Sequence, residues 1–238
     1  MEGTAFQTAD GTLIPAVTAD EMREIDRVAV DDVGLTLLQM MENAGRNLAG
    51  RVLERDPERV AVLAGNGGNG GGGLACGRHL ANRDVSVSVV LDRSPDALDG
   101  AVSTQYRILE GMNVSVTTSD ASDVCSEADT VVDSLIGYGL QGAPRGRTQD
   151  LIDLCNDTET PTVSLDVPSG LDATTGERPG LLVESDEILT LALPKTGLRE
   201  TESRLYLGDV SIPRIVYERV GIEYETPFRE SYCVAVER

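Results

Sequence analysis

The chain has 238 residues, with 40 acidic and 20 basic side chains and a formal charge of −20 at pH 7. So acidic a chain argues against nucleic acid and anionic membranes as partners. No apolar run is long enough to cross a membrane and no export signal opens the sequence, so we expect a cytoplasmic protein. The length suits one domain over residues 1–238, with residues 1–15, which lack periodicity, forming a loose arm.

All but one of the 20 basic side chains are arginine; Lys195 is the only lysine and His79 the only histidine. Dispersed acid with almost no lysine is typical of proteins from a salt-rich, potassium-rich cytoplasm. We therefore expect a halophilic source, with compositional drift as the alternative. The cysteines form no C-x-x-C pair, which predicts reduced structural thiols.

The first predicted elements are two helices. Thr18 and Glu21 stand in the spacing of a capping box, which predicts a helix start. Apolar residues then recur at helical spacing, at Met22, Ile25 and Ala29. After Gly34, residues 37–52 predict a second amphipathic helix, and Pro57 follows its end.

Apolar strands alternate with helical segments from Val60 onward. Strands are expected at 60–63, 85–91, 113–116, 130–136, 162–167, 187–193 and 204–210, and helices at about 72–82, 95–111 and 148–156. This alternation predicts an α/β fold with a doubly wound, mostly parallel sheet, helices on both faces and the N-terminal helices packed on it. A strand order of 3-2-1-4-5 would make the first, fourth and fifth strands neighbours.

A glycine run follows the first of these strands. Residues 64–73 contain seven glycines between strand and helix, so backbone N–H groups are accessible beside a helix N-terminus that favours anions. Residues 65–70 fit the G-x-G-x-x-G pattern, and Asp92 ends the second strand where a ribose-binding acid belongs. A flexible turn and a solvated Asp92 are the simpler alternatives. No lysine follows the glycines, so this is not a P-loop.

Further polar residues follow the fourth and fifth strands, at the edge where doubly wound sheets bind ligands. Asp133 lies in an apolar strand, where an unpaired carboxylate is unfavourable, so it binds a cation or donor or caps a loop. Asp166 ends a strand, where it is either a site residue or the former of a turn. Ser169 likewise either belongs to the site or only occupies the turn. Lys195 is a lysine where arginine would serve equally well for solubility, which suggests that its position requires a compact positive charge. His79 is expected to be a structural or surface residue, because no serine or cysteine nucleophile stands out as its partner.

The chain resembles the YjeF N-terminal family, whose enzymatic members are NAD(P)H-hydrate epimerases. The segments that carry the likeness are residues 40–45, 65–73, 132–142, 164–172, 192–198 and 206–210. The resemblance implies a Rossmann-like fold, a homodimer and K⁺ bound beside the substrate. It also implies a functional link to a separate NAD(P)H-hydrate dehydratase.

The resemblance also assigns roles to residues. Substrate-binding residues are Gly68, Asn69, Gly70, Gly71 and Gly72 in a first loop, Gly137, Tyr138, Gly139, Leu140, Gln141, Gly142 and Ala143 in a second loop, and Asp166; Lys195 is added as the isolated lysine. The K⁺ contacts are Asn69, Asp133 and Ser169. Two positions depart from the family, which has asparagine at the position of Gly68 and aspartate at that of Gly72.

The implied reaction interconverts the R and S forms of hydrated NADH or NADPH by loss and return of water. Asp166 is the expected catalytic residue, because a carboxyl group can protonate the leaving hydroxyl and later accept a proton from the attacking water. One alternative is a catalytically silent nucleotide-binding or scaffold module, similar to the enhancer-of-decapping proteins, which Gly72 favours. A conventional NAD-dependent dehydrogenase would rest on the glycine pattern and Asp92 alone.

Overall fold

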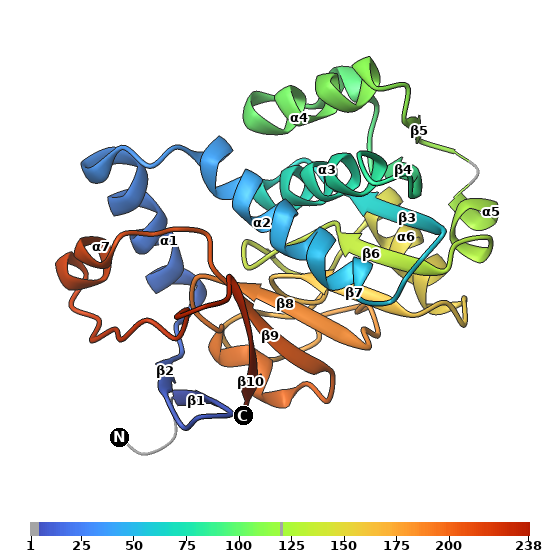
Figure 1. Cartoon of the computed structure of the whole chain (residues 1–238). Helices are drawn as coiled ribbons and strands as arrows, with labels where there is room; N and C mark the ends of the chain where they lie inside the picture. Colours follow the sequence, from blue (N-terminus) through green and yellow to red (C-terminus); the bar gives the residue numbers. More distant parts are fainter. Residues whose placement is uncertain (1–4, 120) are drawn as a thin grey trace.

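The protein is described by a computed structural model over residues 5–119 and 121–238. Ten strands of this part of the chain form one sheet in the order β2-β1-β10-β9-β8-β7-β6-β3-β4-β5 (Figure 1). The strands are β1 (Ala5–Thr8), β2 (Leu13–Pro15), β3 (Arg59–Ala64), β4 (Ser86–Leu91), β5 (Ser115–Thr117), β6 (Thr130–Ser134), β7 (Thr162–Leu165), β8 (Glu187–Leu191), β9 (Arg204–Gly208) and β10 (Cys233–Glu237). The strands from β5 to β9 in this order pair in parallel, and β10, β1 and β2 continue the sheet antiparallel.

The α/β prediction and the predicted strand order are confirmed, since the central strands run β5-β4-β3-β6-β7. The helices are α1 (Ala19–Arg27), α2 (Leu37–Leu53), α3 (Gly68–Ala81), α4 (Gly100–Gly111), α5 (Ala121–Ser126), α6 (Gly146–Asn156) and α7 (Arg214–Arg219). A π-helical turn (Val28–Val33) extends α1, and short 3₁₀ turns lie at Pro95–Ala97 and Thr196–Glu200. No helix of the described residues is both long and apolar enough to span a bilayer.

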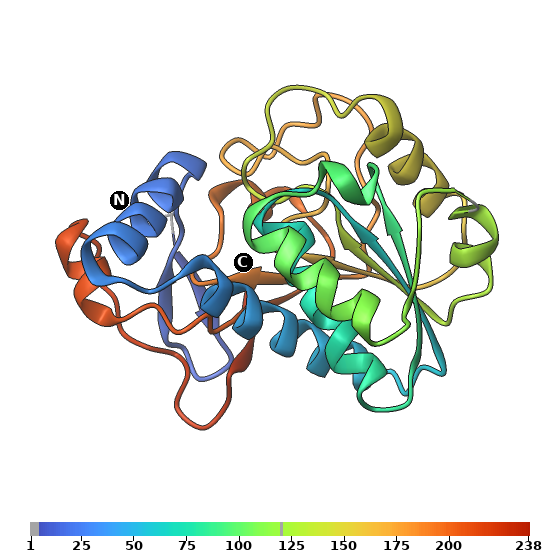
Figure 2. The same ribbon diagram turned by 90° about the horizontal axis from the view of Figure 1, so that it is seen from above.

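Helices cover both faces of the central sheet (Figure 2). Successive side chains of a strand point to opposite faces. In β3, Val60 and Val62 therefore pack in the same cluster as residues of α2, α3 and α4, whereas Ala61 and Leu63 pack with residues of α5 and α6. This explains why β3 reads as a continuous apolar run without alternation.

Residues 5–15 do not form the expected loose arm. Phe6 and Ile14 are fully buried, and β1 pairs with both β2 and β10 at the antiparallel end of the sheet. The strands have only four and three residues, so their alternating pattern is too brief to stand out. Residues 1–4 of the predicted arm lie outside the described part of the chain.

The predicted capping box of α1 is confirmed. The Glu21 N–H donates to Thr18 Oγ1 at 3.2 Å, and the Thr18 N–H donates to Glu21 Oε2 at 2.7 Å. Gly34 ends the π-helical turn with a φ of 87°, a left-handed conformation that glycine adopts without strain. Helix α1 therefore begins at the predicted capping box, and its π-helical extension ends at the predicted glycine.

The glycine run is mostly helix rather than loop, because α3 begins at Gly68 instead of near residue 72. A side chain in this run would collide with the layers on either side. A Cβ at Gly73 would lie 1.9 Å from Ser134 Oγ in the sheet, and one at Gly71 would lie 2.5 Å from Met41 Sδ in α2. The glycines thus let α3 pack closely between α2 and the sheet.

Gly45 of α2 lies where this helix approaches α3 closely, so a substitution there tests the packing. A Cβ there would lie 2.5 Å from Ala75 Cβ and 2.7 Å from the Gly72 carbonyl oxygen of α3. We expect Gly45→Ala to lower the free energy of unfolding by about 1–3 kcal/mol, as overpacking does. Gly50→Ala on the same helix is the control: nothing lies within 4 Å, so it should stabilise by up to about 1 kcal/mol. Denaturant unfolding measures both, and equal effects would contradict the packing account.

Candidate active site

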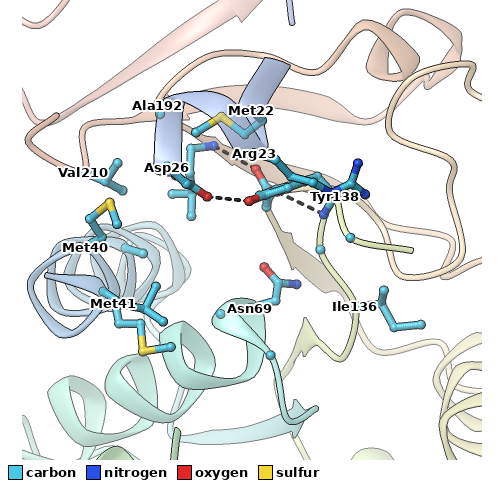
Figure 3. A pocket seen from close by; sticks show the side chains of 18 of the residues that line it. Met22, Arg23, Asp26, Met40, Met41, Asn69, Ile136, Tyr138, Ala192 and Val210 are labelled. Carbon is cyan, nitrogen blue, oxygen red and sulfur yellow. Dashed lines mark hydrogen bonds between the residues drawn. The ribbon is translucent and has the colours of Figure 1, made fainter. Parts of the chain in front are cut away.

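A cavity of about 950 Å³ opens at the carboxyl ends of the central strands (Figure 3). The strands β3, β4 and β5 lie on one side of this point and β6 on the other, so the cavity lies at the switch point of a doubly wound sheet. Residues that follow β3, β4, β6, β7 and β8 line one side of it, and residues of α1 and α2 line the other. The N-terminal helices therefore complete a site that the parallel sheet begins.

Asp166 and Lys195 form a buried ion pair in this cavity. Their side chains are 5% and 1% exposed, and Lys195 Nζ donates to Asp166 Oδ1. Lys195 Nζ also donates to the Leu191 carbonyl at 2.8 Å, and the Leu191 N–H donates to Asp166 Oδ1 at 3.3 Å. A buried charge is tolerated when it is paired and hydrogen-bonded. This contact explains why one lysine stands in a chain otherwise supplied with arginine.

The backbone at the ends of β7 and β8 is held in an unusual conformation. Asp166 has a φ of 67° and Ala192 a φ of 62°, values that non-glycine residues rarely adopt. The Asp166 N–H donates to the Leu189 carbonyl at 2.7 Å, so the neighbouring strand fixes the turn. Both residues line the cavity, and such conformations cluster at functional sites.

Tyr138 connects Asp166 to helix α1. Its backbone N–H donates to Asp166 Oδ2 at 3.3 Å, and its phenol donates to Asp26 Oδ2 (Figure 3). The Lys195 ammonium lies 5.8 Å from the centre of the Tyr138 ring. Burial raises the pKa of Tyr138, with the Asp26 charge acting in the same direction, so the phenol keeps its proton. The sequence did not single out Asp26.

Asp133 lies behind the cavity wall and is completely buried. Its carboxylate accepts from the Ser169 hydroxyl at 2.5 Å, the Ser169 N–H at 2.9 Å and the Ser164 hydroxyl at 2.7 Å. Burial raises the pKa of Asp133, and these hydrogen bonds oppose the rise. No cationic side chain of the described residues pairs with it, so the buried charge lacks a counter-ion from the protein.

Asn69 and Ser169 lie against the segment that separates Asp133 from the cavity. The Ser169 hydroxyl accepts from the Ile136 N–H at 2.8 Å, and a Cβ at Gly137 would lie 3.2 Å from Asn69 Oδ1. Asn69 donates through its nitrogen to the Leu165 carbonyl at 3.0 Å, which leaves its oxygen as an acceptor. The three residues offer only oxygen as a free ligand, the type that hard cations prefer, and both oxygens of Asp133 already accept hydrogen bonds from the protein.

The two predicted substrate loops are only partly at the cavity. Gly68 and Asn69 line it, and so do Gly137, Tyr138 and Gly139. Gly70, Gly71 and Gly72 lie inside α3 and do not line it, and neither do Leu140, Gln141, Gly142 and Ala143. A Cβ at Gly72 would lie 2.7 Å from Leu165 Cδ2, so this departure from the family faces the packed interior.

Asp92 is not a solvated loop acid, the simpler of the two alternatives for this residue. Its side chain is 5% exposed, lines the cavity after β4 and pairs with Arg93 at 2.8 Å. The Thr148 hydroxyl donates to its other oxygen at 3.1 Å. Together with Arg23 and Arg27 of α1, Arg93 brings three guanidinium groups to the cavity of a strongly acidic chain. Sequence reasoning missed these arginines because nothing in their spacing sets them apart.

His79 is structural, as expected. Its Nε2 lies 2.8 Å from Glu42 Oε1 on α2, and it does not line the cavity. Burial lowers its pKa, and the neighbouring Arg78 charge adds to that effect while Glu42 opposes it.

A mainly apolar cavity that holds a buried ion pair lies at the switch point of a doubly wound sheet, which is where α/β proteins of this class bind ligands. Residues 37–197 match the model of the family described as YjeF-related protein N-terminus, and the chain belongs to this family.

Several relatives carry functional names. A protein of Dehalogenimonas lykanthroporepellens named NAD(P)H-hydrate epimerase is 48% identical over 96% of both chains, and one of Pirellula staleyi with the same name is 32% identical over 83% of this chain and 93% of its own. A Salinibacter ruber protein, named bifunctional NAD(P)H-hydrate repair enzyme, is 34% identical over 91% of this chain and 44% of its own. A yeast crystal structure matches 93% of this chain and 100% of its own with a TM-score of 0.83 at 24% identity, which supports the fold.

The ion pair at the cavity predicts a large coupling between its partners. Lys195→Met leaves a buried carboxylate without its cation, and we expect it to lower the free energy of unfolding by about 3–5 kcal/mol. The double variant Lys195→Met with Asp166→Asn should recover part of this loss, because neither charge then remains. Denaturant unfolding of the wild type, the two single variants and the double variant measures the coupling. Strictly additive effects would show that the pair does not act as a unit.

Proposed function

We propose that the protein is an NAD(P)H-hydrate epimerase, an isomerase that interconverts the R and S forms of hydrated NADH or NADPH in metabolite repair. The observation that carries the proposal is the buried Asp166–Lys195 pair in a cavity at the sheet's switch point. The names of relatives that match nearly the whole chain support the same reaction.

The cavity suits a dinucleotide. A volume of about 950 Å³ is at the upper end of the range for small-molecule sites. Arg23, Arg27 and Arg93 line the cavity, and we propose that they share their present carboxylate partners with the phosphates or turn from them. Met40 and Met41 of α2 give an apolar wall for a ring (Figure 3). We assign Gly70, Gly71 and Gly72 to a supporting role, because they are buried in α3 beside this lining.

The proposed reaction needs one proton transferred to the hydroxyl oxygen on the hydrated carbon of the nicotinamide ring and one taken from the water that replaces it. The hydroxyl leaves as water after protonation, the ring nitrogen's electron pair forms a C=N bond, and water adds to the other face as that pair returns to nitrogen. Asp166 is the general acid–base group in this proposal. Lys195 and the N–H groups of Tyr138 and Leu191 hold its carboxylate in place, and positioned groups of this kind act without reorganisation.

We also propose that K⁺ binds through Asn69, Asp133 and Ser169. A bound K⁺ would supply the counter-charge that Asp133 lacks and steady the loop that follows β6. The protein's own part is clear from its contacts, since Ser169 already ties Asp133 to Ile136 at the cavity wall.

The silent-module alternative rested on the missing carboxylate at position 72. Gly72 packs against Leu165 inside the protein, so its lack of a side chain leaves the cavity lining intact. We therefore rank the epimerase first. The bifunctional relatives support a functional link to a dehydratase activity. The homodimer, the cytoplasmic location and the halophilic source are kept as predictions.

Asp166→Asn tests the proposed role of this carboxyl group. With pure R-form hydrated NADH, we expect the wild type to produce the S form faster than it appears without protein. The variant should lose about 10²–10⁴-fold in kcat, the usual contribution of a positioned acid–base group. Nucleotide binding, measured by calorimetry with NADPH, should be retained.

An inactive wild type that still binds nucleotide would favour the silent module. An active wild type with an equally active Asp166→Asn variant would instead remove Asp166 from the chemistry.

Salt tests the K⁺ and halophile proposals together. Screening of self-repulsion should raise the unfolding temperature between dilute and molar salt, equally in KCl and NaCl. A K⁺ site should add a further rise in KCl by mass action, and Asp133→Asn should abolish that difference. Thermal unfolding followed by circular dichroism measures both. No rise in either salt would reject the halophilic prediction, and identical curves in the two salts would reject the K⁺ site.

A further inference from the structure

Tyr138 touches two carboxyl groups at once. Its backbone N–H donates to Asp166 Oδ2 at 3.3 Å, whereas its phenol donates to Asp26 Oδ2 (Figure 3). Asp26 comes from helix α1 and Asp166 from the end of β7, and both line the cavity. One tyrosine therefore spans two carboxyl groups on two walls of the same site.

The surroundings of the two carboxyl groups differ. Asp166 has the Lys195 ammonium as a direct partner. Asp26 pairs with no cation of the described residues. The arginines of its own helix are engaged elsewhere, Arg23 with Asp20, and Arg27 with Glu24 and Asp32.

Burial raises the pKa of Asp26. The Tyr138 hydrogen bond and the Lys195 charge oppose this, and the Asp166 charge acts in the same direction as burial. Tyr217 of α7 also interacts with Asp26, and burial raises the pKa of this tyrosine well above the usual value, so it stays neutral. Asp26 thus holds its proton to higher pH than an ordinary aspartate.

The hydrogen bonds of Asp26 leave a route for that proton. The described residues use only its Oδ2, which accepts from Tyr138. Its Oδ1 has no partner among them, and the side chain lines the cavity. A carboxyl group that accepts through one oxygen and carries hydrogen on the other is arranged as a donor toward the cavity.

We propose that Asp26 is a second acid–base group of this site, giving a proton to the departing ring hydroxyl while Asp166 takes one from the water that adds to the other face. The inference rests on the proposed epimerase function. The C–O bond breaks, water leaves, and the ring nitrogen's pair forms and later releases the C=N bond. The proton that Asp26 gives equals the proton that Asp166 receives, and exchange with water returns both carboxyl groups to their starting states before the next turnover. In the reverse direction the two groups exchange roles.

Inversion at one carbon explains why two groups are useful. Water must leave one face of the ring and arrive at the other, and a carboxyl group fixed on one wall is aimed at one face. Pairs of carboxyl groups with different environments are how enzymes assign acid and base roles at one pH. Asp26 and Asp166 come from different structural elements, and Tyr138 fixes their relation.

Asp26→Asn tests this directly, because an asparagine oxygen can still accept from Tyr138 while the acidic proton is lost. We expect kcat for conversion of the R to the S form to fall by about 10²–10⁴-fold with KM changed only a few-fold. Asp31→Asn is the matched control; it removes an exposed carboxylate from the adjoining π-helical turn, does not line the cavity, and should leave both constants unchanged.

Tyr138→Phe provides a second test that does not depend on the first variant folding. It removes a hydrogen bond that lowers the pKa of Asp26 but keeps the carboxyl group. In the wild type, kcat should fall as the pH rises through the raised pKa of Asp26, because the donor loses its proton. In Tyr138→Phe this fall should move to higher pH.

The outcomes separate the two proposals. A wild type that does not epimerise its substrate overturns the proposed function. An active wild type with an Asp26→Asn variant that matches Asp31→Asn overturns only the role of Asp26. So does a variant with a raised KM and an unchanged kcat, or a Tyr138→Phe variant whose pH dependence equals that of the wild type.

Discussion

The ion pair between Lys195 and Asp166 is the contact on which the site depends. Both side chains are almost completely buried, so each charge is tolerated only because the other is present. Lys195 is placed by a bridge to Val17 ahead of α1, and Asp166 by the left-handed turn after β7. The pair therefore ties the N-terminal segment to the parallel sheet and fixes one wall of the cavity.

A second constraint comes from the glycines between β3 and the middle of α3. Gly71 and Gly73 let the helix lie against Met41 on one side and Ser134 on the other. These two glycines have no side chain, which allows the close packing. Of the helical residues in the run, only Gly68 and Asn69 at its start line the cavity. The ends of β3 and β6 reach the same opening because the two strands pair in parallel, and α3 packs closely over them.

The sequence predicted the central fold well because each signal was local. The capping box at Thr18, the strand beginning near Val60 and the interruption at Gly34 need no distant partner. The short strands β1 and β10 were missed because they are defined by pairing with each other. Asp26 was missed for the same reason: its role depends on Tyr138, 112 positions along the chain. Asp166 and Lys195 were predicted singly, whereas their contact appears only in the folded protein.

In the proposed reaction, hydrated NADH or NADPH bound in this cavity loses one water from one face of its ring and gains another on the opposite face. The most direct measurement is to give the protein pure R-form hydrated NADH in water enriched in oxygen-18 and follow both the S form and its label. We expect the S form to gain one labelled oxygen per conversion, faster than in the absence of protein. An S form produced without label, or no S form above the spontaneous rate, would contradict it.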